Sequence, residues 1–238
     1  MKKIDFKDII LFEDDNFIVI NKPPGMASLD ERYMSQTVKG LAQEYFADAR
    51  PVHRLDKDTS GILLLAKSDE AYRHASIQFE KRQTEKRYLA VVNGRHEFDE
   101  SFIDLPIYAT AKGKAVLDHQ TGKQSLTIAN TVKVYRHHTL VECWPITGRL
   151  HQIRFHLSQE GAPLVGDGLY GGEDIFLSSL KPKFKLGKEK EERPIIQRFA
   201  LHAFSLGFFP MESEEKIVIE APYPKDFGVL IKQLEKFG

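Results

Sequence analysis

The densest group of ionisable side chains lies in residues 53–61, HRLDKDTSG, directly before an apolar run, GILLLAK (61–67). Loops at the ends of buried strands hold functional groups on a rigid support. Asp56 stands close to Arg54 and Lys57, and nearby positive charge favours an ionised carboxylate. Such a carboxylate can act as a nucleophile or a general base. Taken alone, the pattern is more often a solvated turn with an incidental ion pair, so it defines only a candidate site.

Other potentially reactive residues have weaker patterns. His53, His151 and His202 lack the spacing of zinc ligands, so structural hydrogen bonding is the better interpretation and no metal site is predicted. The glycines of GDGLYGG (166–172) are not followed by Gly-Lys-Ser/Thr, so they are interpreted as a turn that shapes a pocket and not as a P-loop. The single cysteine, Cys143, excludes an intramolecular disulfide, and its strand-like neighbours predict a packing role.

The candidate segment must be positioned by the elements around it. Residues 10–22 predict two strands around an Asp-Asp-Asn turn, and 61–67 predicts a buried strand. The apolar residues of 36–47 fall on one face of a helix. A second helix is predicted over 68–82, with Ser68 as its N-cap and two acids in its first turn.

The remainder of the chain continues the alternation of strands and helices. Further strands are predicted over 87–94, in both halves of 125–146 with a turn at His137-His138, and over 198–208 and 215–222. Helices are predicted over 149–161, where Leu150, Ile153 and Leu157 share one face, and over 226–237. Helices among hairpin-like strands predict an α+β fold with a mixed, mainly antiparallel central sheet flanked by helices.

The composition is that of a soluble globular protein, with 42% hydrophobic and 29% charged residues. No apolar run approaches the roughly 18 residues that span a membrane, and the N-terminus does not read as a secretory signal, so a cytoplasmic location is expected. Lys plus Arg equals Asp plus Glu at 34 each, but basic residues concentrate in 71–90 and 181–193. A neutral chain can bind RNA through such a local basic face.

Several segments resemble one known family. HRLDKDTSGILLLAK (53–67) is very similar to the nucleophile segment of the RluA-type family of RNA pseudouridine synthases. Four further segments resemble other motifs of this family and follow the same order along the chain. They are NKPPGM (21–26), EKRYLAVVNG (85–94), PITGRLHQIRFHLSQEGAPLVGDGLYG (145–171) and RFALHAFSLGF (198–208). Five segments in the family's order make the resemblance specific, and it extends from about residue 10 to residue 227.

The resemblance implies a role for each matched residue. Asp56 matches the catalytic aspartate, which attacks the target uridine on the way to a covalent intermediate. Tyr88 matches a tyrosine that lies against the flipped base and can take part in proton transfer. Arg154 matches the basic residue that pairs with the aspartate, and Arg54 the arginine that helps to hold the target nucleotide out of its stack.

Three further residues belong to the expected substrate site. His53 is expected to bind substrate beside Arg54, while Leu55 and Ile153 are expected to support the site by packing. The reaction breaks the N1–C1′ bond of uridine and rejoins the uracil through C5, without redox change or added group, so no cofactor is implied. It needs an ionised carboxylate, a cation to orient it and an aromatic surface for the base.

The resemblance also predicts organisation and partners. Residues 1–238 are expected to form one catalytic domain, with 172–195 as a flexible insertion and no room for the S4 RNA-binding module of many relatives. Substrate choice then falls to loops 28–36, 108–124 and 172–195. The expected substrate is structured RNA, either tRNA or a large-subunit rRNA stem-loop. A monomer without an obligate protein partner and without membrane attachment is expected.

Two other functions stay open. A non-catalytic RNA-binding module would share the basic features but would not need Asp56. An N-glycosidase-like hydrolase would use Asp56 and Asp58, but carboxylates two residues apart at the end of a strand point to opposite faces, which suits a paired acid and base poorly.

Overall fold

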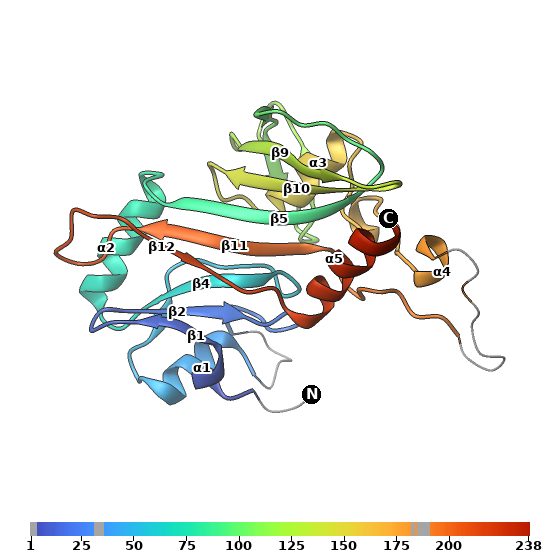
Figure 1. Ribbon diagram of the computed structural model, residues 1–238. Coiled ribbons are helices and arrows are strands. Elements are labelled where there is room, and N and C mark those ends of the chain that lie inside the picture. Colours follow the sequence, from blue (N-terminus) through green and yellow to red (C-terminus); the bar gives the residue numbers. More distant parts are fainter. Residues whose placement is uncertain (1–3, 31–35, 182–183, 185–190) are drawn as a thin grey trace. The chain divides into compact units, whose positions relative to one another are not determined.

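The computed structural model describes residues 4–30, 36–181, 184 and 191–238 (Figure 1). The chain divides into two compact units: unit 1 comprises Met1–Arg87 and Ala203–Pro224, and unit 2 comprises Tyr88–His202 and Lys225–Gly238. Two of the three boundaries fall within strands, β5 (Glu85–Asn93) and β11 (Leu201–Phe208), and the third lies between Pro224 and Lys225. The single catalytic domain predicted over 1–238 is not tested by this division and stays a prediction.

Unit 1 holds the segment that contains Asp56. Its elements are η1 (Phe6–Ile9), β1 (Ile10–Glu13), β2 (Phe17–Lys22), α1 (Val38–Tyr45), β3 (Arg50–Pro51), β4 (Ser60–Ala66), α2 (Asp69–Glu80), β12 (Ile217–Glu220) and most of β11. The strands β1, β2 and β4 lie side by side in antiparallel pairs, and β12 pairs antiparallel with β11 (Figure 1).

The core of unit 1 follows from its continuous apolar strands. All of β4 is buried, and β2 is buried at five of its six positions. Both faces of these strands are therefore covered, as their unbroken apolar runs predict. Gly61, the second residue of β4, has a φ of +112°, and a Cβ there would lie 2.1 Å from the carbonyl oxygen of Ala203, so only glycine permits this backbone approach.

Unit 2 holds the segments that contain Tyr88 and Arg154. Its elements are most of β5, β6 (Ser101–Asp104), β7 (Ile107–Ala109), β8 (Ala115–Leu117), β9 (Leu126–Val134), β10 (His138–Pro145), α3 (Gln152–Gln159), η2 (Gly168–Tyr170), α4 (Leu177–Leu180) and α5 (Lys225–Phe237). The strands β5, β10, β9 and β6 follow one another in antiparallel pairs, and β7 and β8 form a separate two-stranded sheet (Figure 1).

The predicted fold class is confirmed, since helices accompany a mainly antiparallel sheet. The helix predicted over 68–82 forms as α2, and the side chain of Ser68 caps it by accepting from the Ala71 amide. The helix predicted over 149–161 is shorter, because α3 begins at Gln152 and leaves Leu150 outside. Ile153 and Leu157 share one buried cluster as predicted, but all residues from Gln152 to Leu157 are buried, so polar side chains of α3 are enclosed as well.

Two expectations about loops have different outcomes. The expected loop over 108–124 contains part of the β7–β8 hairpin. The expected insertion over 172–195 includes the short helix α4, but residues 182–183 and 185–190 lie outside the described part of the chain. Among the described residues, no helix has both the length and the apolar character needed to cross a membrane.

Candidate active site

Asp56 lies in an irregular segment, residues 53–59, between β3 and the start of β4. Its side chain is half-buried, whereas Arg54 and Lys57 on either side are exposed. Leu55 is only 6% exposed, so it anchors the segment in unit 1. This alternation of exposed and buried residues places the Asp56 carboxylate at an accessible position, on a backbone that the buried Leu55 anchors. The burial of Leu55 is consistent with its predicted supporting role.

A serine from the N-terminal part of unit 1 fixes the backbone next to Asp56. The hydroxyl of Ser28 donates to the Leu55 carbonyl oxygen at 2.9 Å, and it accepts from the Leu55 amide at 3.0 Å. Ser28 is itself 4% exposed. One buried hydroxyl thus satisfies both backbone groups of an irregular residue, which would otherwise cost free energy inside the protein.

The buried amine of Lys22 holds the other side of the segment. Its Nζ donates to the carbonyl oxygens of Pro23 at 3.0 Å, Met26 at 2.9 Å and Lys57 at 2.9 Å, and the side chain has no solvent exposure. The amide of Gly25 donates to the same Lys57 oxygen at 2.9 Å. The NKPPGM turn is therefore tied to the residue that directly follows Asp56, a function that the sequence alone did not reveal.

His53 is tied into the base of the segment. Its Nε2 accepts the Leu64 amide at 3.1 Å, which requires the proton to sit on Nδ1, and the ring stacks on Phe79 at 4.7 Å between centroids. Burial, reinforced by the positive charge of Lys86, lowers the pKa of His53 to about 3. The ring is thus neutral at physiological pH and supports β4. Its substrate-binding role stays a prediction.

Lys86 is a second perturbed base in unit 1. Burial, together with the charge of Arg82, lowers the pKa of the Lys86 amine to about 8. The amine stands on β5, two residues before Tyr88. The amine is therefore more easily deprotonated than an exposed lysine, because burial and then the charge of Arg82 disfavour its cationic form.

Tyr88 packs against the buried cluster of unit 2 that contains Ile153. Tyr88 lies on β5 opposite Cys143 of β10, and it packs at the edge of a buried cluster that includes Ile153 and Leu164. Cys143 is buried and burial raises the pKa of its thiol, so the predicted packing role is confirmed. One edge of the tyrosine ring is therefore fixed by apolar contacts, while the residue as a whole stays half-buried.

Arg154 is buried on α3, and its partner within unit 2 is Asp167. The Nε donates to Asp167 Oδ2 at 2.6 Å and Nη2 donates to Oδ1 at 2.8 Å. Both side chains are less than a tenth exposed. The guanidinium also lies 4.0 Å from the Phe199 ring centroid and 5.1 Å from that of Tyr170. A two-point carboxylate contact and two aromatic rings thus fix the plane of the cation. The pairing of Arg154 with Asp56 stays a prediction.

Asp167 is the residue that sequence reasoning missed, and it stands in the GDGLYGG turn. Its backbone carbonyl accepts from the amides of Tyr170 at 3.0 Å and Gly172 at 2.9 Å. A Cβ at Gly172 would meet the Leu164 carbonyl oxygen at 1.8 Å, so that position requires glycine. The glycine-rich turn therefore presents a buried carboxylate to α3. The sequence shows an acid inside a glycine-rich turn, but no local pattern in it pairs Asp167 with Arg154.

The other two candidate histidines, His151 and His202, make contacts within the fold. His151 Nδ1 lies 2.9 Å from the Tyr170 hydroxyl, which also accepts from the Ala115 amide at 2.8 Å. The buried ring of His202 packs against Phe227 of α5, at 5.8 Å between centroids. Within the described ranges, no group of three or more His, Cys, Asp or Glu side chains could hold a metal ion.

Comparison with known proteins gives consistent matches. The family model described as RNA pseudouridylate synthase matches residues 16–159. The chain is 35% identical to ribosomal large subunit pseudouridine synthase C of Buchnera aphidicola subsp. Baizongia pistaciae, over 97% of this chain and 72% of that protein. It is 33% identical to the dual-specificity RNA pseudouridine synthase RluA of Vibrio vulnificus, over 86% and 78%. Human RNA pseudouridylate synthase domain containing 4 has a TM-score of 0.71 at 25% identity, covering 97% of this chain and 94% of that one.

The first prediction concerns His53 and pH. Because its folded pKa of about 3 lies below the unfolded value, only the unfolded state binds this proton between those two values. The stabilisation is thus complete above about pH 6.5 and is lost as the pH falls toward 3. Lowering the pH from 7 to 5 should reduce the free energy of unfolding of the wild type. In His53→Gln this reduction should be smaller, by up to about 2 kcal/mol. Urea unfolding at each pH measures this difference.

A matched control is the exposed His119, since His119→Gln should leave the wild-type pH dependence in place. Burial also lowers the pKa of His138 and His156, so part of the slope should persist in His53→Gln. Identical slopes in His53→Gln and the wild type would show that His53 is protonated in the folded protein, contrary to its contact with the Leu64 amide.

The second prediction concerns the partner of Arg154. Replacing Asp167 by Asn keeps the shape but removes the carboxylate charge from the buried two-point contact with Arg154, which should cost about 3–5 kcal/mol of unfolding free energy. The pair of Arg198 and Asp226 is the matched control, because Asp226 is 32% exposed and water can compensate its loss. Asp226→Asn should therefore cost less. Urea unfolding of both variants tests which one loses more unfolding free energy. A loss below about 1 kcal/mol in Asp167→Asn would contradict the role of Asp167 as the buried partner of Arg154.

Proposed function

Because the chain belongs to the RNA pseudouridylate synthase family, we propose that it isomerises specific uridines in structured RNA, with Asp56 as the nucleophile. The observation that carries this proposal is the family match over residues 16–159, which includes Asp56, Tyr88 and Arg154 in the expected order. The relatives named above are RNA pseudouridine synthases, which are isomerases.

The proposed reaction conserves the atoms of the nucleotide. The Asp56 carboxylate attacks the target uridine, the N1–C1′ bond breaks, and the uracil turns while it is still bound. A bond then forms between C5 and C1′, the bond between the nucleotide and the Asp56 carboxylate breaks, C5 loses its proton to solvent, and N1 gains one. The net change is an isomerisation, so the protein has to supply a nucleophile, a fixed cation and a surface that retains the free base.

The local structure supports Asp56 in this role. The carboxylate is half-buried on a backbone that Ser28 and Lys22 hold on both sides. Holding the nucleophile in one geometry reduces the entropy that the reaction must otherwise lose. The exposed Arg54 is suited to contact phosphate or to fill the space left by a flipped base, since its side chain is not needed for packing.

Unit 2 contains the aromatic residue and the cation that the proposed reaction needs. Tyr88 offers an aromatic surface for the uracil, and it packs against the buried cluster to which Ile153 belongs. Arg154 orients the charge of the Asp56 carboxylate, and Asp167 orients Arg154 through the two-point contact described above. Asp167 engages the guanidinium along the edge formed by Nε and Nη2, which fixes the plane in which the cation can act.

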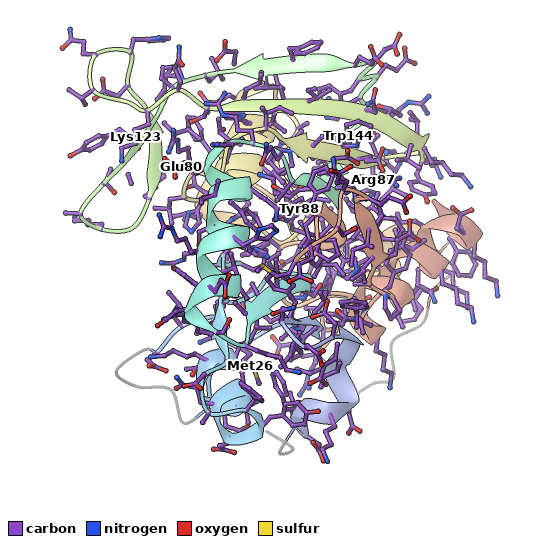
Figure 2. The ribbon with its side chains drawn as sticks, turned by 90° about the vertical axis from the view of Figure 1, so that its left-hand side faces the viewer. Met26, Glu80, Arg87, Tyr88, Lys123 and Trp144 are labelled. Atoms are coloured by element: carbon purple, nitrogen blue, oxygen red, sulfur yellow. The ribbon has the colours of Figure 1, made fainter. Side chains whose placement is uncertain are left out.

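The proposed substrate is structured RNA. One relative named above is a large-subunit rRNA enzyme and the other has dual RNA specificity, so both tRNA and rRNA are tested below. The β7–β8 hairpin is suited to phosphate contact because its loop carries the exposed Lys112 and Lys114, and Lys123 pairs with Ile107 at its base (Figure 2). The exposed Tyr108 can stack on a base. The expected cytoplasmic location and monomeric state remain predictions.

The experiment uses tRNA and, separately, rRNA labelled with tritium at C5 of uridine. The wild-type protein should release tritium into water from one of these pools, because formation of the C5–C1′ bond expels the C5 hydrogen. Asp56→Asn should reduce the rate by at least about three orders of magnitude while RNA binding persists, since the amide cannot replace the nucleophile.

Asp58→Asn is the matched control, because Asp58 is a half-buried carboxylate in the same turn and has no chemical role in the proposal. It should retain most of the tritium release. The two alternative functions give other results. A non-catalytic RNA-binding module releases no tritium, and an N-glycosidase-like hydrolase releases free uracil while the label stays on C5. An Asp56→Asn variant with undiminished release would exclude Asp56 as the nucleophile.

A further inference from the structure

The strands β6, β9 and β10 present apolar side chains on the face that points away from the core of unit 2. Trp144 pairs with Ile128, and Ile128 pairs with Phe102, so these three residues form one row across the strands. Their neighbours along the strands, such as Cys143 and Ala129, belong to the buried core. Because side chains alternate along a strand, the row of Trp144, Ile128 and Phe102 lies on the opposite, outer face.

The row continues into a second apolar pair. Leu126 precedes Ile128 by two residues and faces the same way, and the amide of Ile146 donates to its carbonyl oxygen at 3.0 Å. The outer face is defined here by Phe102, Leu126, Ile128, Trp144 and Ile146. Phe102 is 66% and Trp144 41% exposed. A solvated face of an antiparallel sheet normally carries polar side chains, so a row of large apolar residues marks a docking surface.

Acidic side chains border this outer face. Asp104 pairs with Leu126 and is exposed, and at the opposite side Glu142 pairs with Asn130. The amide of Glu100 donates to Asn130 Oδ1 at 2.7 Å, which places the exposed Glu100 in the same border. The preceding Glu97 and Asp99 are also exposed and extend the acidic character along the approach to β6.

Two basic side chains lie on or just beyond the same strands. Lys133 of β9 pairs with Glu235 of α5, and Arg149, just beyond β10, donates to the Gln124 carbonyl oxygen at 3.2 Å. Arg149 keeps its positive charge in this contact, but the five acids named above outnumber these two bases, so the surroundings of the outer face are acidic on balance. Such a border repels the phosphates of RNA, and it also repels an identical face of a second copy.

We propose that the outer face of β6, β9 and β10 docks an extended cationic segment of another protein, in which apolar residues alternate with Lys or Arg. The apolar side chains would cover Trp144 and Phe102, and the cations would meet Asp104 and Glu100. Among the described strands of unit 2, β6 stands at the end of the order β10-β9-β6, so an extended segment can align beside it. The inference is independent of the proposed isomerisation.

Trp144 makes the proposal directly measurable, because it is the only tryptophan in the chain. It lies on β10, next to the strand that carries Tyr88 (Figure 2). The probe is a synthetic peptide of alternating leucine and lysine, and its counterpart alternates leucine and glutamate. The lysine peptide should shift Trp144 emission to shorter wavelength and protect it from acrylamide, in a saturable manner, while the glutamate peptide should do neither.

Charge reversal tests the acidic border. The double variant Glu100→Lys with Asp104→Lys should weaken binding of the lysine peptide at least tenfold in the same fluorescence titration. The matched control is Glu214→Lys, an exposed acid of unit 1, which should bind as the wild type does. Circular dichroism confirms that each variant is folded, which the exposure of all three side chains favours.

Each other result of these titrations overturns the proposal. An absent Trp144 response shows that the face does not dock the peptide, and an equal response to the glutamate peptide shows a purely apolar contact. A saturable response to bulk tRNA assigns the face to RNA. A blue shift that grows with protein concentration alone assigns it to a second copy of the chain. Unchanged affinity in the double variant removes the role of the acidic border.

Discussion

The buried amine of Lys22 and the three carbonyl oxygens around it are the constraint on which the Asp56 segment depends. The chain between β3 and β4 has no ladder of its own, so its polar backbone groups must be satisfied one by one. Lys22 satisfies the carbonyl of Lys57 together with two carbonyls of its own turn. Ser28 satisfies both backbone groups of Leu55. Asp56 therefore sits between two fixed points, one residue away on either side.

The other half of the proposed chemistry uses the same physical solution. A charged side chain that must act in one orientation is held by a buried partner, as Arg154 is by Asp167. Burial of a charged pair contributes little net stability, because desolvation offsets the attraction. Its benefit is geometric, since the guanidinium between the Tyr170 and Phe199 rings has one plane. In both units, buried polar contacts thus serve to orient a functional group more than to stabilise the fold, which is typical of functional sites.

Whether a feature could be predicted from the sequence depends on how far apart in the chain its interacting residues lie. The strands of 10–22 and 61–67 and the Ser68 cap arise from local periodicity and capping, and all three were predicted and are present. The Lys22 and Asp167 contacts span 35 and 13 residues, and no local pattern records such distances. The short strands β6, β7 and β8 were missed because three or four residues are too few to establish a period. The resemblance located Asp56, Tyr88 and Arg154, but it did not show what holds them.

The most direct test of this account separates chemistry from binding in a Lys22→Met variant. Methionine has a similar length but cannot donate to the three carbonyl oxygens, so the backbone beside Asp56 should lose its fixed geometry. Single-turnover isomerisation of an RNA that the wild type modifies should slow at least about tenfold, while the dissociation constant for that RNA changes by less than about twofold. Near-ultraviolet circular dichroism establishes that the variant is folded at the assay temperature. A folded Lys22→Met variant with the wild-type single-turnover rate would contradict the account, because Asp56 would then be positioned without the amine.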